Sequence, residues 1–290
     1  MATVIAEPAI GRHARALDPV TNVNERLGRT SLGVTFPRVI RSEWVKLRSL
    51  QSNWVTMLSA AVVMIGVGAL SAAFLSDTIA GGGDGFADTT DPTTTSLSGM
   101  MLAQIIVGIV GVLANTSEFA NGMLRTTFAA VPKRLPVLWA KVVVVAGVTF
   151  AVMLPTMFVT FFIGQVIIGG DLNASHSDGG VLRAVIGSAG YLTAIALLGL
   201  GLGSILRQAA GAIGTIFALL LIVPGLLGLV LPASIGDDTL KYLPSNAGQA
   251  VTWIGPTDGL LSPAAGSLVV LGWVAAFLGV AAVLLKRRDA

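Results

Sequence analysis

Six long apolar runs limit this chain to a membrane-embedded helical fold. Each run has about 20 residues or more, the length that an α-helix needs to cross roughly 30 Å of hydrocarbon. By residue number, the runs are approximately 54–75, 97–115, 142–168, 182–206, 211–231 and 264–285. The composition agrees, with 54% hydrophobic and only 11% charged residues, which is far from that of a soluble domain. The sequence therefore predicts an all-α membrane protein with six transmembrane helices.

The lysines and arginines indicate how these helices are oriented, because such residues are retained on the cytoplasmic side of a membrane. Of the 18 lysines and arginines, all except Arg183 and Lys241 lie before residue 54, within residues 118–141, at position 207 or after residue 285. Both termini and the segment 118–141 are therefore predicted to be cytoplasmic. A nucleic-acid partner is not expected, since the cations follow one face of the membrane and not one folded surface.

The N-terminal region divides into two parts that precede the first span. Residues 1–34 are mixed, arginine-rich and aperiodic, and we expect a disordered cytoplasmic tail. Residues 35–52 have apolar side chains at helical spacing and cations on the opposite side, which predicts an amphipathic helix at the membrane interface, in contact with lipid headgroups. Its apolar side comprises Phe36, Ile40, Trp44, Leu47 and Leu50. Glu43 and Val45 interrupt this pattern, although Glu43 is within reach of Lys46.

The cytoplasmic connection 116–141 is too polar to cross hydrocarbon. It holds one anion, Glu118, and several cations. Pro132 is expected to end a short helix, and Pro136 can open the next long one. A short helix tied at both ends to spanning helices could pass motion from a soluble partner into the membrane, which is our hypothesis for this segment.

Glycine and proline positions predict the packing of the later spans. Gly199 and Gly203 form a G-x-x-x-G pattern, which allows close approach of helices within the chain or between copies. Pro224 and Gly225 are expected to break or bend the fifth span. The outer connection 232–263 mixes apolar and turn residues, which predicts short helices at the outer interface.

No enzyme is predicted from this sequence. No G-x-x-x-x-G-K-[ST] motif occurs, so the chain has no P-loop for ATP. The only histidines, His13 and His176, lie outside the spans, and cysteine is absent. There is accordingly no candidate for nucleophilic or metal-dependent catalysis, and we expect the chain itself to bind no cofactor or metal.

Four stretches of the sequence together resemble the permease subunit of bacterial ABC-2 type transporters. They are RSEWVKLRSLQSNW (residues 41–54), the pattern E-F-x-x-G-x-L-R … P-x-R … K from Glu118 to Lys141, KYLPSNAGQAV (residues 241–251) and the ending LLKRRDA. The resemblance runs from Arg41 to the C-terminus, and the order of the motifs matches the topology derived from charge.

This resemblance implies a six-helix transmembrane domain, residues 53–290, in the bacterial plasma (inner) membrane. Such a half-transporter dimerises with a second copy of the permease and binds two copies of a separate cytoplasmic ABC ATPase, which would hold ATP and Mg²⁺. The path of the exported substrate would run between the two permease copies. The substrate is unknown, because uncharged spans permit a hydrophobic drug, a peptide or a lipid-linked molecule.

The resemblance also assigns roles to particular residues. Those expected to couple the permease to the ATPase are Glu118, Phe119, Gly122, Arg125, Pro132 and Arg134. Those of the connecting helix, which touches the ATPase in the family, are Arg41, Glu43, Trp44, Lys46, Leu47 and Arg48. Among them, Glu118 and Arg125 are the best candidates for direct contact with the ATPase.

Two other functions are compatible with the sequence. One is a secondary transporter or channel that works alone, although ionisable residues are missing from the middle of every span and ion coupling usually needs them. The other is a membrane immunity or scaffold protein that binds a partner without moving it. Substrate flux that depends on an ion gradient would indicate the first, and measurable flux of any kind would exclude the second.

Overall fold

The protein is mainly helical in the part of the chain that the computed structural model describes, namely residues 35–49, 51–81, 91–120, 134–169, 174, 179–254 and 259–287. Six helical segments are long and apolar enough to cross a membrane. Their bounds are Gln51–Ala80, Met100–Phe119, Leu135–Ile168, Val181–Leu206, Ala209–Val230 and Pro263–Arg287. The predicted all-α fold with six spanning helices is thus confirmed.

Five of the spans are single α-helices and one is composite. The single ones are α3 (Gln51–Ala80), α6 (Met100–Ala120), α8 (Arg134–Ile168), α9 (Val181–Leu206) and α14 (Pro263–Arg287). The fifth span consists of α10 (Ala209–Phe217), the π-helical η2 (Ala218–Ile222) and α11 (Val223–Val230). The short helices are α2 (Phe36–Ser49), α5 (Pro92–Ser96), α12 (Ala233–Leu240) and α13 (Pro244–Thr252).

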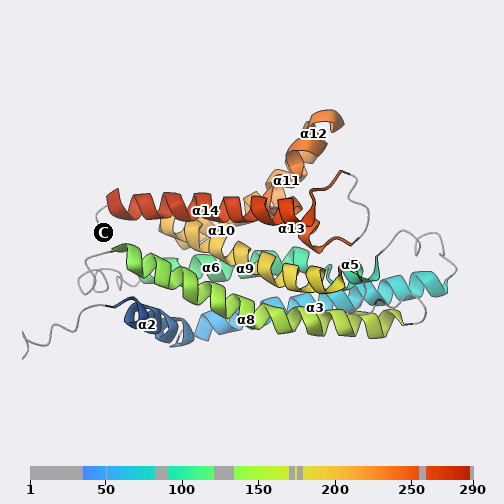
Figure 1. Cartoon of the computed structure of the whole chain (residues 1–290), viewed down its shortest axis with the longest axis horizontal. Helices are drawn as coiled ribbons and strands as arrows, with labels where there is room; N and C mark the ends of the chain where they lie inside the picture. The colour runs from blue at the N-terminus through green and yellow to red at the C-terminus, as the bar shows by residue number, and fades with distance from the viewer. Residues whose placement is uncertain are drawn as a thin grey trace, which may run out of the picture. The chain divides into compact units, whose positions relative to one another are not determined.

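Helix α9 is the central packing element. It packs against α6, α8 and α14, and α3 packs against α8 and α6 (Figure 1). Leu192, Ile195, Leu198 and Leu200 of α9 are fully buried. Such all-round apolar burial is expected of a helix that is surrounded by other helices.

The glycines of α9 serve packing within the chain. A Cβ atom on Gly199 would collide with the carbonyl oxygen of Gly108, and one on Gly203 would lie 2.9 Å from the carbonyl oxygen of Val112. From the other side, a Cβ on Gly111 would meet the backbone of Ala196. The G-x-x-x-G pattern therefore brings the α6 and α9 backbones together.

The fifth span departs from α-helical geometry where its proline was expected to disturb it. Pro224 has no N–H to donate, and its ring crowds the carbonyl of Leu220 one turn earlier. The π-helical stretch η2 includes Leu220 and ends just before Val223. The α11 segment that follows has no buried residue, and Leu229 is 85% exposed. This span is therefore both irregular and largely uncovered by its own chain.

The connection 232–263 contains the short helices that the sequence predicts, α12 and α13. Helix α13 packs against α9 and α14. Arg183, near the start of α9, donates from its guanidinium to the carbonyl oxygens of Val251 and Trp253, both at 2.9 Å. A cation at the C-terminal end of α13 also interacts favourably with the helix dipole.

Candidate functional site

Helix α2 lies against α8 through a face that differs from the apolar side read from the sequence. Its buried residues are Val39, Glu43 and Leu47, which follow one another at four-residue spacing and form one row on the helix. Trp44 was expected to share the apolar side of Leu47, but it is 42% exposed. Glu43, which interrupted the sequence pattern, occupies the middle of the buried row.

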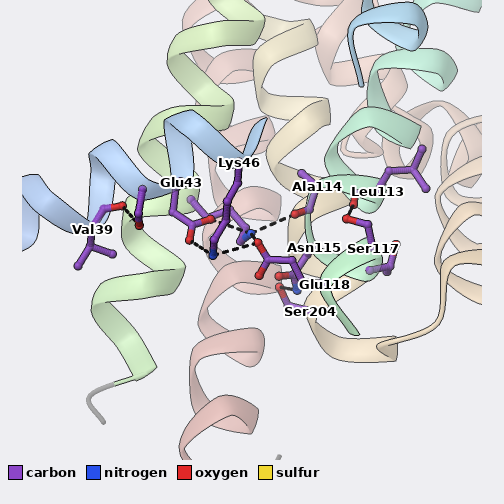
Figure 2. Close-up of polar contacts among 12 residues, drawn as sticks. Val39, Glu43, Lys46, Leu113, Ala114, Asn115, Ser117, Glu118 and Ser204 are labelled. Carbon is purple, nitrogen blue, oxygen red and sulfur yellow. Dashed lines mark hydrogen bonds and ion pairs between the residues drawn. The ribbon is translucent and has the colours of Figure 1, made fainter. Parts of the chain in front are cut away.

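An ionic cluster made of Glu43, Lys46, Glu118 and Lys141 joins three helices at this place (Figure 2). Lys141 Nζ of α8 lies 2.9 Å from Glu43 Oε2 of α2 and 2.7 Å from Glu118 Oε1 of α6. Lys46 Nζ of α2 lies 2.7 Å from Glu43 Oε1 and 3.4 Å from Glu118 Oε1. Each lysine thus contacts both glutamates, and the cluster carries no net formal charge.

Lys141 makes three polar contacts within the described part of the chain. Besides the two carboxylates, its ammonium donates to the carbonyl oxygen of Ala114 at 3.1 Å. An ammonium group has three N–H donors, and here each of them has an acceptor. The bond to Ala114 is possible because the last turns of α6 run directly past the first turns of α8.

Burial makes these contacts strong and makes their loss costly. Glu43, Glu118 and Lys141 have relative exposures of 3%, 5% and 5%. An ion pair in such surroundings is screened little by solvent, and removal of one partner leaves a buried charge that nothing compensates. The cluster therefore fixes the relative positions of α2, α6 and α8.

The pKa values of Glu43 and Lys46, the two cluster residues of α2, reflect a competition between burial and attraction to opposite charges. Burial favours the neutral form of Glu43, but attraction to Lys141 and hydrogen bonds from Lys46 and Lys141 outweigh it, so its pKa lies below the ordinary value of 4.5. Burial likewise favours neutral Lys46, but the hydrogen bond to Glu43 and the attraction of both carboxylates raise its pKa above 10.5. Both side chains are therefore charged at neutral pH.

A small cavity adjoins the ionic cluster. Its volume is about 10 Å³, and its lining includes Leu47, Asn53 and Val144 in addition to the four charged residues. Glu118 Oε2 and Asn53 Nδ2 are buried and have no hydrogen-bond partner among the described residues. A space of this size accommodates about one water molecule, far too little for a substrate.

The end of α6 is also tied to α9 and the turn that follows it. Asn115 Nδ2 donates to Ser204 Oγ at 2.8 Å. The guanidinium carbon of Arg207, in the turn between α9 and α10, lies 5.2 Å from the centre of the Phe119 ring, within the range of a cation–π interaction. Glu118 and Phe119 thus stand at a junction that involves α2, α6, α8 and α9.

The structure brings together only part of the predicted site. Glu43, Lys46 and Glu118 meet in the ionic cluster, and Leu47 lines its cavity. The other connecting-helix residues, Arg41, Trp44 and Arg48, are exposed. Gly122, Arg125 and Pro132 lie outside the described residues, and Arg134 opens α8.

Helical structure extends into both ends of the segment that the sequence assigned to the cytoplasmic connection. Helix α6 continues through Glu118 to Ala120, and α8 begins at Arg134. Lys141, which was not among the predicted site residues, is the centre of the ionic cluster. A signal for it was present, because a lysine followed directly by four valines stands at the start of a span, where a charge is costly unless it is paired.

The chemistry of the ionic cluster is structural. It contains no histidine or cysteine, and each charge is matched by an opposite one within 3.4 Å. Across the described ranges, His, Cys, Asp and Glu do not gather in any group of three or more that could hold a metal ion. The arrangement is suited to joining helices so that they move together.

Comparison with known protein families gives one match that covers most of this architecture. A family model described as "ABC-2 family transporter protein" matches residues 39–225. The matched region begins within α2, contains all four residues of the ionic cluster and ends beside Pro224 of the fifth span. No curated protein matches the chain.

Proposed function

The chain belongs to the ABC-2 transporter family and is a transmembrane permease, and from this premise we propose that it is the membrane subunit of an exporter driven by a separate cytoplasmic ATPase. The ATPase would bind ATP and Mg²⁺, and the permease would provide the path for substrate. We place it in a bacterial plasma membrane on the basis of the family resemblance, and the charge distribution supports an orientation with both termini and the ionic cluster on the cytoplasmic side.

The observation that carries this proposal is the ionic cluster itself. It ties α2 to α6 and α8, the two spans that border residues 121–133. The family resemblance puts the coupling helix in this segment. Force applied to the segment by a moving ATPase would act directly on Glu118 and Lys141, whose side chains are bonded to each other at 2.7 Å.

Such a network transmits motion because it resists being pulled apart. Separation of a buried carboxylate from its ammonium partner exposes both to an environment that solvates charge poorly. Moving α6, α8 and α2 as one unit keeps every ion pair intact. The lower-energy response to a push is therefore displacement of the three helices together.

The candidate coupling residues differ in burial, and we therefore propose different roles for them. Glu118 is 5% exposed and already bonded within the cluster, so we assign it a positioning role. Arg41 and Arg48 lie on the uncovered face of α2, where they can meet an acidic or polar surface. We propose that this face and the segment that holds Arg125 contact the ATPase.

A second permease copy is part of the proposed exporter. The fifth span offers a surface for it, because α11 has no buried residue and Leu226, Leu229 and Val230 are 55%, 85% and 75% exposed. The fifth span is also the span that its own chain covers least, with 11% of its most apolar window buried against 28–72% in the other five, and helices in lipid associate through the van der Waals packing of such faces. Disulfide formation between copies that carry Leu229→Cys would support this interface, since the natural chain has no cysteine.

Co-reconstitution tests the proposal most directly. The permease would be purified with the Walker-A protein encoded by a neighbouring gene and placed in liposomes, and ATP hydrolysis would be measured with and without the permease. We expect the permease to stimulate hydrolysis. The Glu118→Ala/Arg125→Ala double variant should insert but lose this stimulation and any ATP-dependent transport, and its apparent melting temperature would be measured in parallel because the loss of Glu118 also weakens the buried ionic cluster.

An exposed ion pair provides the matched control. Asp238 and Lys241 form a 2.6 Å pair on and just after α12, so Asp238→Ala removes an ion pair far along the chain from the cluster and should leave the stimulation unchanged. Flux driven by an ion gradient without any ATPase would indicate a secondary transporter or channel. Binding of a partner without any flux would indicate an immunity or scaffold protein.

A further inference from the structure

A pocket of about 230 Å³ lies at the end of α6 opposite the ionic cluster. One wall comes from α5 and the start of α6, and the other from α13 and the residue after it. Its lining consists of Thr94, Leu97, Ser98, Met100, Met101, Gln104, Ser245, Gln249, Thr252 and Trp253. None of these side chains is charged, and the lining contains hydroxyl, amide and apolar groups.

Both walls of this outer pocket are anchored to α9. Tyr191 of α9 donates its hydroxyl to Gln104 Oε1 at 2.5 Å. On the α13 side, a Cβ on Gly248 would collide with the ring of Tyr191, and Arg183 holds the carbonyl oxygens of Val251 and Trp253. The pocket is therefore a preformed feature of the fold, as ligand sites commonly are.

The hydroxyl groups that line the outer pocket already use their protons inside the protein. Thr94 Oγ1 donates to Asp91 Oδ2 at 2.6 Å, and Thr252 Oγ1 donates to the carbonyl oxygen of Gln249 at 2.9 Å. Ser245 Oγ donates to the Asn246 side chain at 3.2 Å. Since each hydroxyl oxygen has two lone pairs besides its proton, these hydroxyl groups offer acceptors and favour a ligand that brings hydrogen-bond donors, while the side-chain amide of Gln249 offers both N–H donors and an acceptor.

The rest of the lining defines the ligand further. Met100, Met101, Leu97 and Trp253 present adaptable apolar and aromatic surface. A charged ligand would meet no oppositely charged side chain in this lining, and burial of an unpaired charge is costly. The volume is below the roughly 300–1,000 Å³ of sites for drug-sized ligands, so a small molecule or one end of a larger molecule would fit.

We propose that the outer pocket binds an uncharged amphipathic molecule that has an aromatic or aliphatic body and at least one O–H or N–H donor. Binding of this class is a property of the permease alone. That such a molecule is also the exported substrate rests on the proposed function.

The chain has no cysteine, which allows a site-specific test on the full-length permease in lipid nanodiscs. Met101→Cys puts a single thiol at a lining position that is 58% exposed in the wild-type protein. Its rate of reaction with N-ethylmaleimide would be measured alone, with 2-naphthol, which is uncharged and carries one donor, and with 2-methoxynaphthalene, which has the same body and no donor. Tyr242→Cys, at a residue that is 51% exposed and outside the lining, is the control.

We expect 2-naphthol to slow the reaction at Met101→Cys and to leave Tyr242→Cys unaffected. The donor-free analogue should need about a five-fold higher concentration for the same protection. This is the difference in affinity that corresponds to the loss of one ordinary hydrogen bond. Thr252→Val keeps the shape of the side chain but removes its oxygen, so combined with Met101→Cys it should reduce this preference.

Several outcomes would overturn the proposal. They are an unreactive Met101→Cys thiol, absence of protection by 2-naphthol, equal protection by both naphthalenes, and protection of Tyr242→Cys, which would show mere partition into the bilayer. Because the assay contains no ATPase, failure here would leave ATPase coupling untouched. Conversely, loss of ATPase coupling would leave the binding result intact.

Discussion

The two ends of α6 are built from opposite kinds of chemistry. Near its C-terminal end, Glu118 belongs to a buried network of two carboxylates and two ammonium groups. Near its N-terminal end, Gln104 accepts a single neutral hydrogen bond from Tyr191 and lines a pocket without charge. Fourteen positions separate the two residues, about 20 Å along an α-helix.

The difference shows how one helix can hold firmly at one end and admit a ligand at the other. Buried ion pairs are costly to separate but leave no room, and the cavity beside them is about 10 Å³. Neutral hydrogen bonds cost less to rearrange, and the pocket at that end is about 230 Å³. A rigid helix between them connects the proposed coupling end to the proposed binding end.

Replacement of the central lysine should give the largest effect. Lys141→Met removes the cation shared by Glu43, Glu118 and the Ala114 carbonyl, and leaves two buried carboxylates with only Lys46 between them. We expect a loss of about 3–5 kcal/mol in stability. The apparent melting temperature of the permease in lipid nanodiscs would measure it.

A companion variant separates charge from packing in this first prediction. Adding Glu118→Gln to Lys141→Met removes one carboxylate along with the ammonium and leaves Glu43 paired with Lys46 at 2.7 Å. It should recover much of the lost stability, because the remaining charges are balanced. If the double variant were as unstable as the single one, the apolar contacts of Lys141 would matter more than its charge.

The ionic cluster should weaken in acid, where Glu43 becomes protonated, and should be unaffected near neutral pH. Since its pKa lies below 4.5, Glu43 stabilises the fold fully above that value, and this contribution is lost as the pH falls through the lowered pKa. Lys46, whose pKa lies above 10.5, contributes fully below that value and loses its contribution only as the pH rises through the raised pKa. The contribution of the ionic cluster to stability should therefore be constant between about pH 4.5 and pH 10.5.

The variant Glu43→Gln tests this pH dependence. At neutral pH this substitution should reduce the free energy of unfolding by about 1–3 kcal/mol, because it removes one of the two carboxylates of the ionic cluster. The reduction would be measured as a lower apparent melting temperature. The gap between variant and wild type should shrink below pH 4.5. A gap that stayed constant in acid would mean that Glu43 acts through its shape alone.

Particular residues show how far sequence reasoning reached. The six spans could be predicted because hydropathy over 20 residues is a local property, and Pro224 correctly marked the irregular part of the fifth span. The pairing of Glu43 with Lys46 was also within reach, because three residues along a helix bring side chains together.

The contact between Lys141 and Glu43 could not be predicted in this way. Lys141 and Glu43 are far apart in the sequence, and they meet only because α2 turns its row of Val39, Glu43 and Leu47 towards α8. Helix orientation depends on packing with other helices, which a periodicity of one segment does not contain. The outer pocket is likewise a product of where α13 docks on α9.

At the opposite end of α6, removal of one hydroxyl should have a smaller effect than any change in the ionic cluster. Tyr191→Phe deletes the donor to Gln104 Oε1 and preserves the ring. Hydrogen bonds between membrane helices contribute about 0.6 kcal/mol on average, so a shift of that order is expected in the same melting assay. A loss as large as that of Lys141→Met would erase the contrast between the two ends.

The smallest effect is expected where an ion pair is exposed. Asp238 and Lys241 are as close as any pair in the ionic cluster, at 2.6 Å, but the Asp238 side chain is 78% exposed and Lys241 is only three residues away. Water solvates both charges whether or not they pair, and screening by salt weakens their attraction further. Asp238→Ala should therefore leave the apparent melting temperature unchanged at neutral pH. A measurable loss would mean that proximity of charges, independent of burial, stabilises this protein, and would remove the physical reason for treating the buried end of α6 as special.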